Sequence, residues 1–168
     1  NFLSKECLKL KKKIRWVQLS SVGVFGFNSK SKLKFLTEMS ETNPSNTYES
    51  TKLISDNVLI ENKNEFFEYN ILRPYTIYGK NMKSEFLKNL SYYLEKKLFF
   101  YIGSKNSILN LIHVNDVIDA LIICGNSNIK NETFNLSNDC QLKDLIKEKY
   151  FIKKTNHKFI ITIPEFIV

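Results

Sequence analysis

Pro44-Ser-Asn-Thr-Tyr48-Glu-Ser-Thr-Lys52-Leu-Ile-Ser-Asp56 is the stretch around which the rest of the chain is organised. Tyr48 and Lys52 stand one helical turn apart, ahead of an apolar run with helical spacing, so a helix from about Thr47 to Asn62 would place them on one face. A phenol ionises near pH ~10, and a nearby ammonium group favours the phenolate. The spacing therefore predicts a pair of side chains that exchanges a proton with a substrate hydroxyl or carbonyl.

The same spacing recurs in this lysine-rich chain, so it does not identify a site by itself. Taken singly, a solvated helix face or a strand end is the favoured explanation of any one copy. The other copies are Tyr92/Lys96, Tyr93/Lys97, Tyr101/Lys105 and Tyr150/Lys154. The segments upstream and downstream of Tyr48 decide which pair carries chemistry.

Length and composition indicate a folded domain. The chain has 168 residues, and its 43% hydrophobic content excludes a disordered tail. No apolar run approaches the ~20 residues of a membrane span, and the N-terminus has no signal-peptide pattern. Three widely spread cysteines without metal-ligand spacing predict buried thiols, no metal site and a cytoplasmic location. The start at Asn1 and the apolar end Ile-Pro-Glu-Phe-Ile-Val predict a fragment of a longer protein.

The net charge of +8 raises the possibility of a nucleic-acid partner. Against it, Arg15 and Arg73 are the only arginines, whereas base and phosphate readers draw on the bidentate guanidinium group. The densest basic run, from Lys9 to Arg15, stands where a helix ends before a strand, which is a favourable place for cations. We therefore expect no nucleic-acid partner.

Helical and extended patterns alternate along the chain, which predicts the α/β class with a parallel sheet flanked by helices. Predicted helices cover 2–13, 47–62, 84–97, 117–124 (capped by Asn115 and Asp116) and 142–149. Predicted strands cover 15–19, 68–73, 98–102, 110–114, 133–136 and 159–163, with turns at 20–26 and 76–79 and a surface loop at 28–46. In open α/β sheets, ligands bind at the carboxyl ends of the strands.

Four blocks of sequence, in this order, resemble the extended short-chain dehydrogenase/reductase family of NAD(P)-dependent epimerases, dehydratases and reductases. They are Leu19-Ser-Ser-Val-Gly-Val-Phe-Gly26, Tyr48-Glu-Ser-Thr-Lys52, Ile71-Leu-Arg-Pro-Tyr-Thr-Ile-Tyr-Gly79 and Ile112-His-Val-Asn-Asp-Val117. The resemblance implies the C-terminal part of a Rossmann-like sheet, made of residues 1–79 and 108–137. Residues 80–107 and 138–168 would form part of a small substrate-binding domain.

Carried over by position, the resemblance gives roles to individual residues. Ser21 matches the catalytic serine or threonine, Tyr48 the acid/base tyrosine and Lys52 the lysine that holds the nicotinamide ribose. Pro74 and Tyr75 match the stretch beside the nicotinamide ring, and Ser21, Thr76 and Tyr78 are the expected substrate contacts. For His113 and Asp116 we favour structural roles: a local contact for His113 and a helix cap for Asp116.

The implied activity is hydride transfer with NAD or NADP, coupled to proton transfer through Tyr48, on a sugar or sugar nucleotide. Val22-Gly23 stand where many dehydratases carry an Asp-Glu pair, which counts against dehydration and leaves epimerase and reductase open. The family's Gly-rich cofactor turn is absent from this sequence, and no arginine stands between Ser107 and Leu111 to contact a substrate diphosphate. The alternative is a non-catalytic binding module that kept the fold. The resemblance leaves open a homodimer for the full-length protein.

Overall fold

The computed structural model describes residues 2–10, 12–26, 36–79, 88–90, 92–93, 96, 98–102, 108–141 and 162–163. The chain divides into two compact units. Unit 1 comprises residues Asn1–Ile77 and Ile112–Ser137, and unit 2 comprises Tyr78–Leu111 and Asn138–Val168.

Unit 1 is built on a parallel sheet with the strand order β1-β2-β6, which confirms the predicted α/β class. Its strands are β1 (Ile14–Leu19), β2 (Phe67–Pro74) and β6 (Glu132–Leu136). Every residue of β2 is buried, as expected for the central strand of a parallel sheet. The residues of β1 are only partly buried or exposed, because β1 lies at an edge of the sheet among the described residues.

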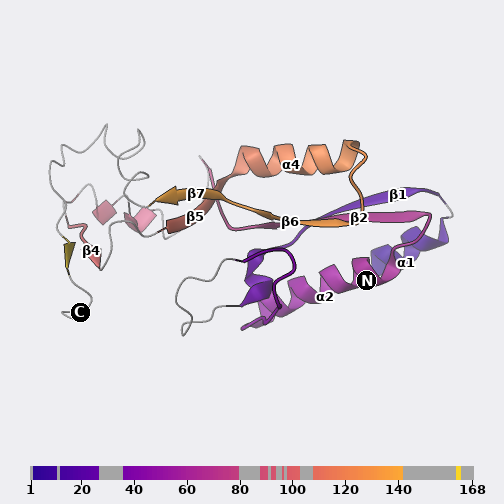
Figure 1. Ribbon diagram of the computed structural model, residues 1–168, viewed down its shortest axis with the longest axis horizontal. Coiled ribbons are helices and arrows are strands. Elements are labelled where there is room, and N and C mark those ends of the chain that lie inside the picture. The colour runs from indigo at the N-terminus through magenta and orange to yellow at the C-terminus, as the bar shows by residue number, and fades with distance from the viewer. Residues whose placement is uncertain are drawn as a thin grey trace. The chain divides into compact units, whose positions relative to one another are not determined.

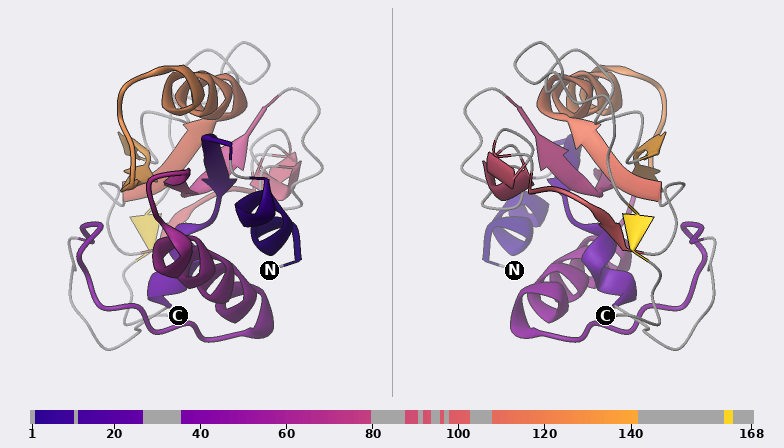
Figure 2. Two further views of the ribbon diagram at one scale, coloured as in Figure 1. Left: turned by 90° about the vertical axis from the view of Figure 1, so that its right-hand side faces the viewer. Right: turned by 90° about the vertical axis from the view of Figure 1, so that its left-hand side faces the viewer.

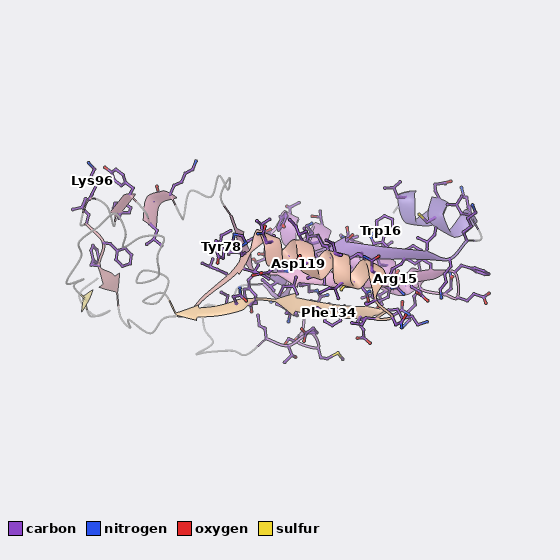
Figure 3. The ribbon with its side chains drawn as sticks, turned by 90° about the horizontal axis from the view of Figure 1, so that it is seen from above. Arg15, Trp16, Tyr78, Lys96, Asp119 and Phe134 are labelled. Atoms are coloured by element: carbon purple, nitrogen blue, oxygen red, sulfur yellow. The ribbon has the colours of Figure 1, made fainter. Side chains whose placement is uncertain are left out.

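Helices lie on both faces of this sheet (Figure 1). Helix α4 (Val114–Asn126) covers one face, and α1 (Phe2–Lys9) and α2 (Thr47–Asn62) cover the other. The end views in Figure 2 show the same layers. Figure 3 looks onto the α4 side and labels Asp119 of α4, Trp16 of β1 and Phe134 of β6. The chain therefore winds to both sides of the sheet, as in doubly wound α/β folds.

The side chains of β2 alternate between the two faces, so each face receives a distinct set of contacts. Toward α1 and α2, Phe67, Tyr69 and Ile71 form a buried apolar cluster with Leu59. Toward α4, the Asn70 side-chain amide donates to the carbonyls of Cys124 at 3.0 Å and of Ile129 at 2.9 Å. A buried amide with both donors bonded fixes the end of α4 against the central strand.

The amino ends of the strands carry a group of ion pairs centred on the buried Glu68 (Figure 3 labels Arg15). The Glu68 carboxylate lies 3.0 Å from Lys13 and 3.1 Å from both Arg15 and Lys130. Hydrogen bonds from Lys13, Arg15 and Lys130, in that order of size, hold the pKa of Glu68 at about 2, below its ordinary value of 4.5. This end of the sheet is electrostatically satisfied.

The remaining strands form two further sheets. One has the order β3-β5-β7, made of β3 (Thr76–Tyr78), β5 (Ile108–His113) and β7 (Asn138–Gln141), with β5 and β7 antiparallel. The other pairs β4 (Tyr101–Ile102) with β8 (Thr162–Ile163) in parallel.

Several predicted elements need correction. Residues 76–78, predicted as a turn, form strand β3, and β7 was not predicted. Helix α4 begins at Val114 and its cap is His113, whose Nδ1 accepts from the backbone N–H of Asn115 at 3.2 Å. The predicted cap residue Asp116 lies inside the first turn of α4. The capping acceptor is a histidine ring nitrogen and not the carboxylate that was expected. The predicted helix at 142–149 lies outside the described residues.

Candidate active site at the carboxyl ends of the strands

The helix that carries Tyr48 and Lys52 begins and ends where the sequence predicted, at Thr47 and Asn62. Its N-cap is Asn46, whose side chain accepts from the Glu49 N–H at 3.0 Å. The Glu49 carboxylate in turn accepts from the backbone N–H of Ser45 at 2.6 Å and from its hydroxyl at 2.7 Å, which lowers the pKa of Glu49. These reciprocal bonds resemble a capping box and fix the first turn of α2.

Tyr48 and Lys52 lie together on this helix. The Lys52 Nζ is 5.7 Å from the centroid of the Tyr48 ring, within the range of a cation–π contact. Tyr48 is 59% exposed. The Lys52 ammonium also donates to the carbonyl of Leu19, the last residue of β1, at 2.9 Å. This bond fixes the pair at the carboxyl end of a parallel strand.

The turn that follows β1 packs against the same helix. After Ser20, residues Val22–Phe25 form a short 3₁₀ helix, η1, and Ser21 is its N-cap: the Ser21 Oγ accepts from the Gly23 N–H at 3.1 Å. A side chain at Gly23 would meet the Glu49 Cγ at 3.0 Å and the Ser21 Oγ at 3.3 Å. Gly23 therefore allows the Ser21 turn to approach the first turn of α2. From the strand-end positions of these two segments we also expect the Ser21 hydroxyl to open toward the Tyr48 phenol, and this stays a prediction.

Gly26 closes this turn in a conformation that favours glycine. Its φ of 68° lies in the left-handed region, and a Cβ there would overlap the Asn43 carbonyl. The Asn43 N–H donates to the Val24 carbonyl at 3.0 Å, which joins the loop before α2 to the turn after β1. The two segments that carry Ser21 and Tyr48 are thus held side by side.

The remaining predicted site residues lie at or beyond the end of β2. Pro74 is buried and ends β2, and the half-buried Tyr75 donates its backbone N–H to the Leu136 carbonyl at 2.9 Å. The two predicted substrate contacts fall in different units: the exposed Thr76 belongs to unit 1 and the half-buried Tyr78 to unit 2.

Sequence reasoning gave no role to Asp56, a buried carboxylate on the helix that carries Tyr48 and Lys52. The Asp56 Oδ2 accepts from the Ser20 hydroxyl at 2.8 Å and from the Arg73 Nε at 3.1 Å. Burial raises the pKa of Asp56 above its ordinary value, although the Ser20 hydrogen bond and then Arg73 act in the opposite direction. Two signals were present in the sequence: Asp56 stands one turn beyond Lys52, and Arg73 is one of two arginines.

Unpartnered polar atoms gather at this end of the sheet. Among the described residues, the buried side-chain atoms without a hydrogen-bond partner are the Asp56 Oδ1, both amide atoms of Asn135 and the Ser137 Oγ. Asn135 is in register with Arg73, and Ser137 follows the end of β6. Native proteins rarely leave such atoms unpaired, and bound water, a ligand or a catalytic role can each account for them.

The described residues bring together neither a set of metal ligands nor a membrane-spanning helix. No three side chains among His, Cys, Asp and Glu come together there in a way that could hold a metal ion. No helix in the described part of the chain is long and apolar enough to cross a membrane.

Comparisons with known proteins agree with this architecture. The chain is 28% identical over 120 residues to a GDP-6-deoxy-D-talose 4-dehydrogenase of Aggregatibacter actinomycetemcomitans, which covers 70% of this chain and 39% of that protein. Its fold is similar to that of the UDP-glucuronic acid 4-epimerase from Bacillus cereus in complex with NAD, with a TM-score of 0.69, 21% identity and coverage of 97% of this chain and 54% of that one. It is also similar to the UDP-glucose 4-epimerase of Thermotoga maritima with UDP-glucose, with a TM-score of 0.68, 20% identity and coverage of 96% and 54%.

This chain therefore spans about half the length of those solved structures, or less than half in the case of the curated relative. The family model described as "NAD dependent epimerase/dehydratase family" matches residues 3–137. That match includes β1, α2, β2 and α4, and with them every block on which the resemblance was based. The chain belongs to the NAD dependent epimerase/dehydratase family.

Proposed function

We propose that the full-length protein is an NAD(P)-dependent epimerase or reductase that acts on a sugar or sugar nucleotide, with Tyr48 as its acid/base. One observation carries the proposal: the Lys52 ammonium is bonded to the Leu19 carbonyl at a strand end and lies beside the exposed Tyr48 ring. Family membership and relatives that act on nucleotide sugars support this reading.

The residues present fit the nicotinamide half of a cofactor. An ammonium group has three donors, and one of those of Lys52 is held by Leu19, so the group is oriented while keeping donors suited to ribose hydroxyls. Pro74 ends the neighbouring strand and Tyr75 follows it, so both would lie toward the nicotinamide ring. A bound nicotinamide would supply the hydride chemistry. NAD and NADP both remain candidates, since solved structures of similar fold carry NAD in one case and NADPH in another.

The chain's own residues would manage the proton. The Tyr48 hydroxyl would give a proton to the substrate oxygen, or take one from it, and the neighbouring ammonium would stabilise the negative charge left on the phenol. The Ser21 hydroxyl would hold the same substrate oxygen by a hydrogen bond. We propose that unit 1 binds the cofactor and that unit 2 contributes to the substrate site, with Thr76 and Tyr78 as contacts.

The test is to incubate the full-length protein with NAD⁺ or NADPH and with UDP-, dTDP- and GDP-linked sugars in turn. An epimerase would convert the sugar without net change in the nicotinamide absorbance, whereas a reductase would consume reduced cofactor. Cofactor binding measured by calorimetry without conversion of any sugar would favour the non-catalytic binding module. A full-length protein that does not bind the cofactor and does not convert any of these sugars would contradict the proposal.

A further inference from the structure

The Lys52 ammonium depends on an acceptor that another group must hold in place. A lysine side chain is a flexible four-carbon stem, so its charged end is placed by what it bonds to. The acceptor here is the Leu19 carbonyl at the end of β1, which belongs to the peptide bond between Leu19 and Ser20. Any shift of this strand end would move the ammonium away from Tyr48.

Two bonds of Ser20 hold the strand end. Its backbone N–H donates to the Leu72 carbonyl of β2 at 2.7 Å, which continues the sheet by one bond beyond β1. Its hydroxyl donates to the Asp56 Oδ2 at 2.8 Å. Asp56 lies on α2 one turn beyond Lys52. The helix that carries the lysine therefore also holds the side chain of Ser20, the residue that follows the lysine's acceptor Leu19.

Asp56 is in turn fixed from the central strand. The Arg73 Nε donates to the same carboxylate oxygen at 3.1 Å, and the Arg73 guanidinium lies 5.2 Å from the centre of the Phe25 ring in η1. The Asp56 side chain is 0% exposed. One carboxylate oxygen therefore joins the end of β1, helix α2, strand β2 and, through Arg73, the turn that contains Ser21.

Stability alone does not account for a carboxylate here. A buried ion pair is often replaced by apolar residues at no loss of stability, because removing both ions from water is costly. The other carboxylate oxygen, Oδ1, is buried without a partner, and burial raises the pKa of the group despite Ser20 and Arg73. Glu68, at the opposite end of the same strand, shows how this fold fully compensates a buried carboxylate with three cations.

We propose that Asp56 and Ser20 are positioning residues, which hold the end of β1 so that the Leu19 carbonyl places the Lys52 ammonium beside Tyr48 and the nicotinamide ribose. This inference rests on the proposed function. Asp56 and Ser20 touch neither substrate nor cofactor in this scheme and act only through Lys52. Their effect on ligand binding should therefore disappear once Lys52 is removed.

The test is a double-mutant cycle on the full-length protein, with the dissociation constant of the nicotinamide cofactor measured by calorimetry. Ser20→Ala is the main variant, because it removes the hydroxyl and leaves the Asp56–Arg73 pair and the fold intact. We expect Lys52→Ala to weaken cofactor binding about tenfold to a hundredfold, as loss of a charged hydrogen bond does. Ser20→Ala should weaken it about threefold to tenfold alone, and less than about twofold in the Lys52→Ala background.

Asp56→Asn is the second variant, since it keeps the size of the side chain and removes its charge. Glu68→Gln is the matched control: it also removes a buried, ion-paired carboxylate, but at the amino ends of the strands. The control should lower the urea midpoint and leave the cofactor dissociation constant within about twofold. A crystal structure of Ser20→Ala should show the Lys52 Nζ beyond hydrogen-bond reach of the Leu19 carbonyl.

Two results would count against the inference, and they are distinguishable. If Ser20→Ala and Asp56→Asn weaken binding by the same factor with Lys52 as without it, or not at all, positioning through Lys52 is wrong while the proposed function stands. If Lys52→Ala leaves cofactor binding unchanged, the positioning role fails; the proposed function fails with it only if that variant also turns over substrate at the wild-type rate.

Discussion

The two units each contain an exposed tyrosine with a lysine one helical turn later, and the two pairs differ little in themselves. In unit 1, the Lys52 Nζ lies 5.7 Å from the centre of the Tyr48 ring; in unit 2, the Lys96 Nζ lies 6.0 Å from that of Tyr92. The two phenol side chains are 59% and 53% exposed. Pair geometry and exposure therefore do not distinguish a catalytic candidate from a solvated helix face.

The surroundings of the two pairs make the difference. Lys52 is anchored to the Leu19 carbonyl at the end of a parallel strand, and its helix is fixed by a cap and by the buried Asp56. Lys96 is exposed, and within the described part of the chain its ammonium meets only the Tyr92 ring. A reactive pair needs a further contact that fixes the ammonium group, because a lysine side chain is flexible.

The largest expected effect separates the two tyrosines. Tyr48→Phe in the full-length protein should reduce turnover by ~10²–10⁴-fold with little change in cofactor affinity, because it removes only the oxygen that transfers the proton. Tyr92→Phe, which removes the same oxygen from the matching pair, should leave turnover nearly unchanged. Steady-state kinetics on both variants decide the point, and equal losses would contradict the comparison.

The lysines come next. Lys52→Ala should weaken cofactor binding about tenfold to a hundredfold and also reduce turnover, because Lys52 is proposed to serve both the ribose and the phenol. Lys96→Ala should change neither. Calorimetric titration with the preferred nicotinamide cofactor measures the first effect. If Lys52→Ala loses turnover but binds cofactor normally, Lys52 does not hold the ribose, and only its proposed role beside the phenol remains.

A substitution in the turn after β1 tests the contacts that hold this turn against the loop before α2. Gly26→Ala should cost about 1–3 kcal/mol of unfolding free energy for the positive φ alone, and more because the new Cβ overlaps the Asn43 carbonyl. Gly125→Ala is the control: no atom lies within 4 Å of the Cβ position in α4, so it should stabilise by roughly 0.5–1 kcal/mol. Urea unfolding of both variants tests this, and a neutral Gly26→Ala would mean that the turn adapts.

The smallest expected effect is the pH dependence of the unfolding free energy that Glu68 causes. Glu68 lies at the opposite end of the sheet from the candidate site. Because the folded pKa of Glu68, about 2, lies below its ordinary 4.5, its ion pairs stabilise fully above pH 4.5 and lose that contribution as the pH falls toward 2. The difference in unfolding free energy between wild type and Glu68→Gln should shrink over the same window. A difference that does not depend on pH would show that packing, and not the ion pairs, is responsible.

Much of unit 1 could be predicted from the sequence, because its signals are local. The helix at Thr47–Asn62 was predicted with its bounds, because the helical spacing of its apolar residues continues through Leu59. Strands β1 and β2 were predicted to within one residue at each end, because the Ser20-Ser21 turn follows the first and Pro74 ends the second.

What escaped prediction depends on contacts between distant segments. Ser20 and Ser21 are adjacent serines in a turn, and only the fold shows that Ser20 bonds Asp56 while Ser21 caps η1. Strand β3 was predicted as a turn, because three residues after a proline carry little extended signal without their partner strand. The cap of α4 was assigned to Asn115 and Asp116, since a histidine cap is less common than a carboxylate or amide.

Lysine accessibility in the full-length protein tests the central claim most directly, because it reports on both pairs in one experiment and requires neither a substrate nor a substitution. The protein is reductively methylated with and without saturating nicotinamide cofactor, and each lysine is quantified by mass spectrometry. Cofactor should protect Lys52 and leave the labelling of Lys96 unchanged. Equal labelling of Lys52 in both conditions, or protection of Lys96 instead, would contradict the account.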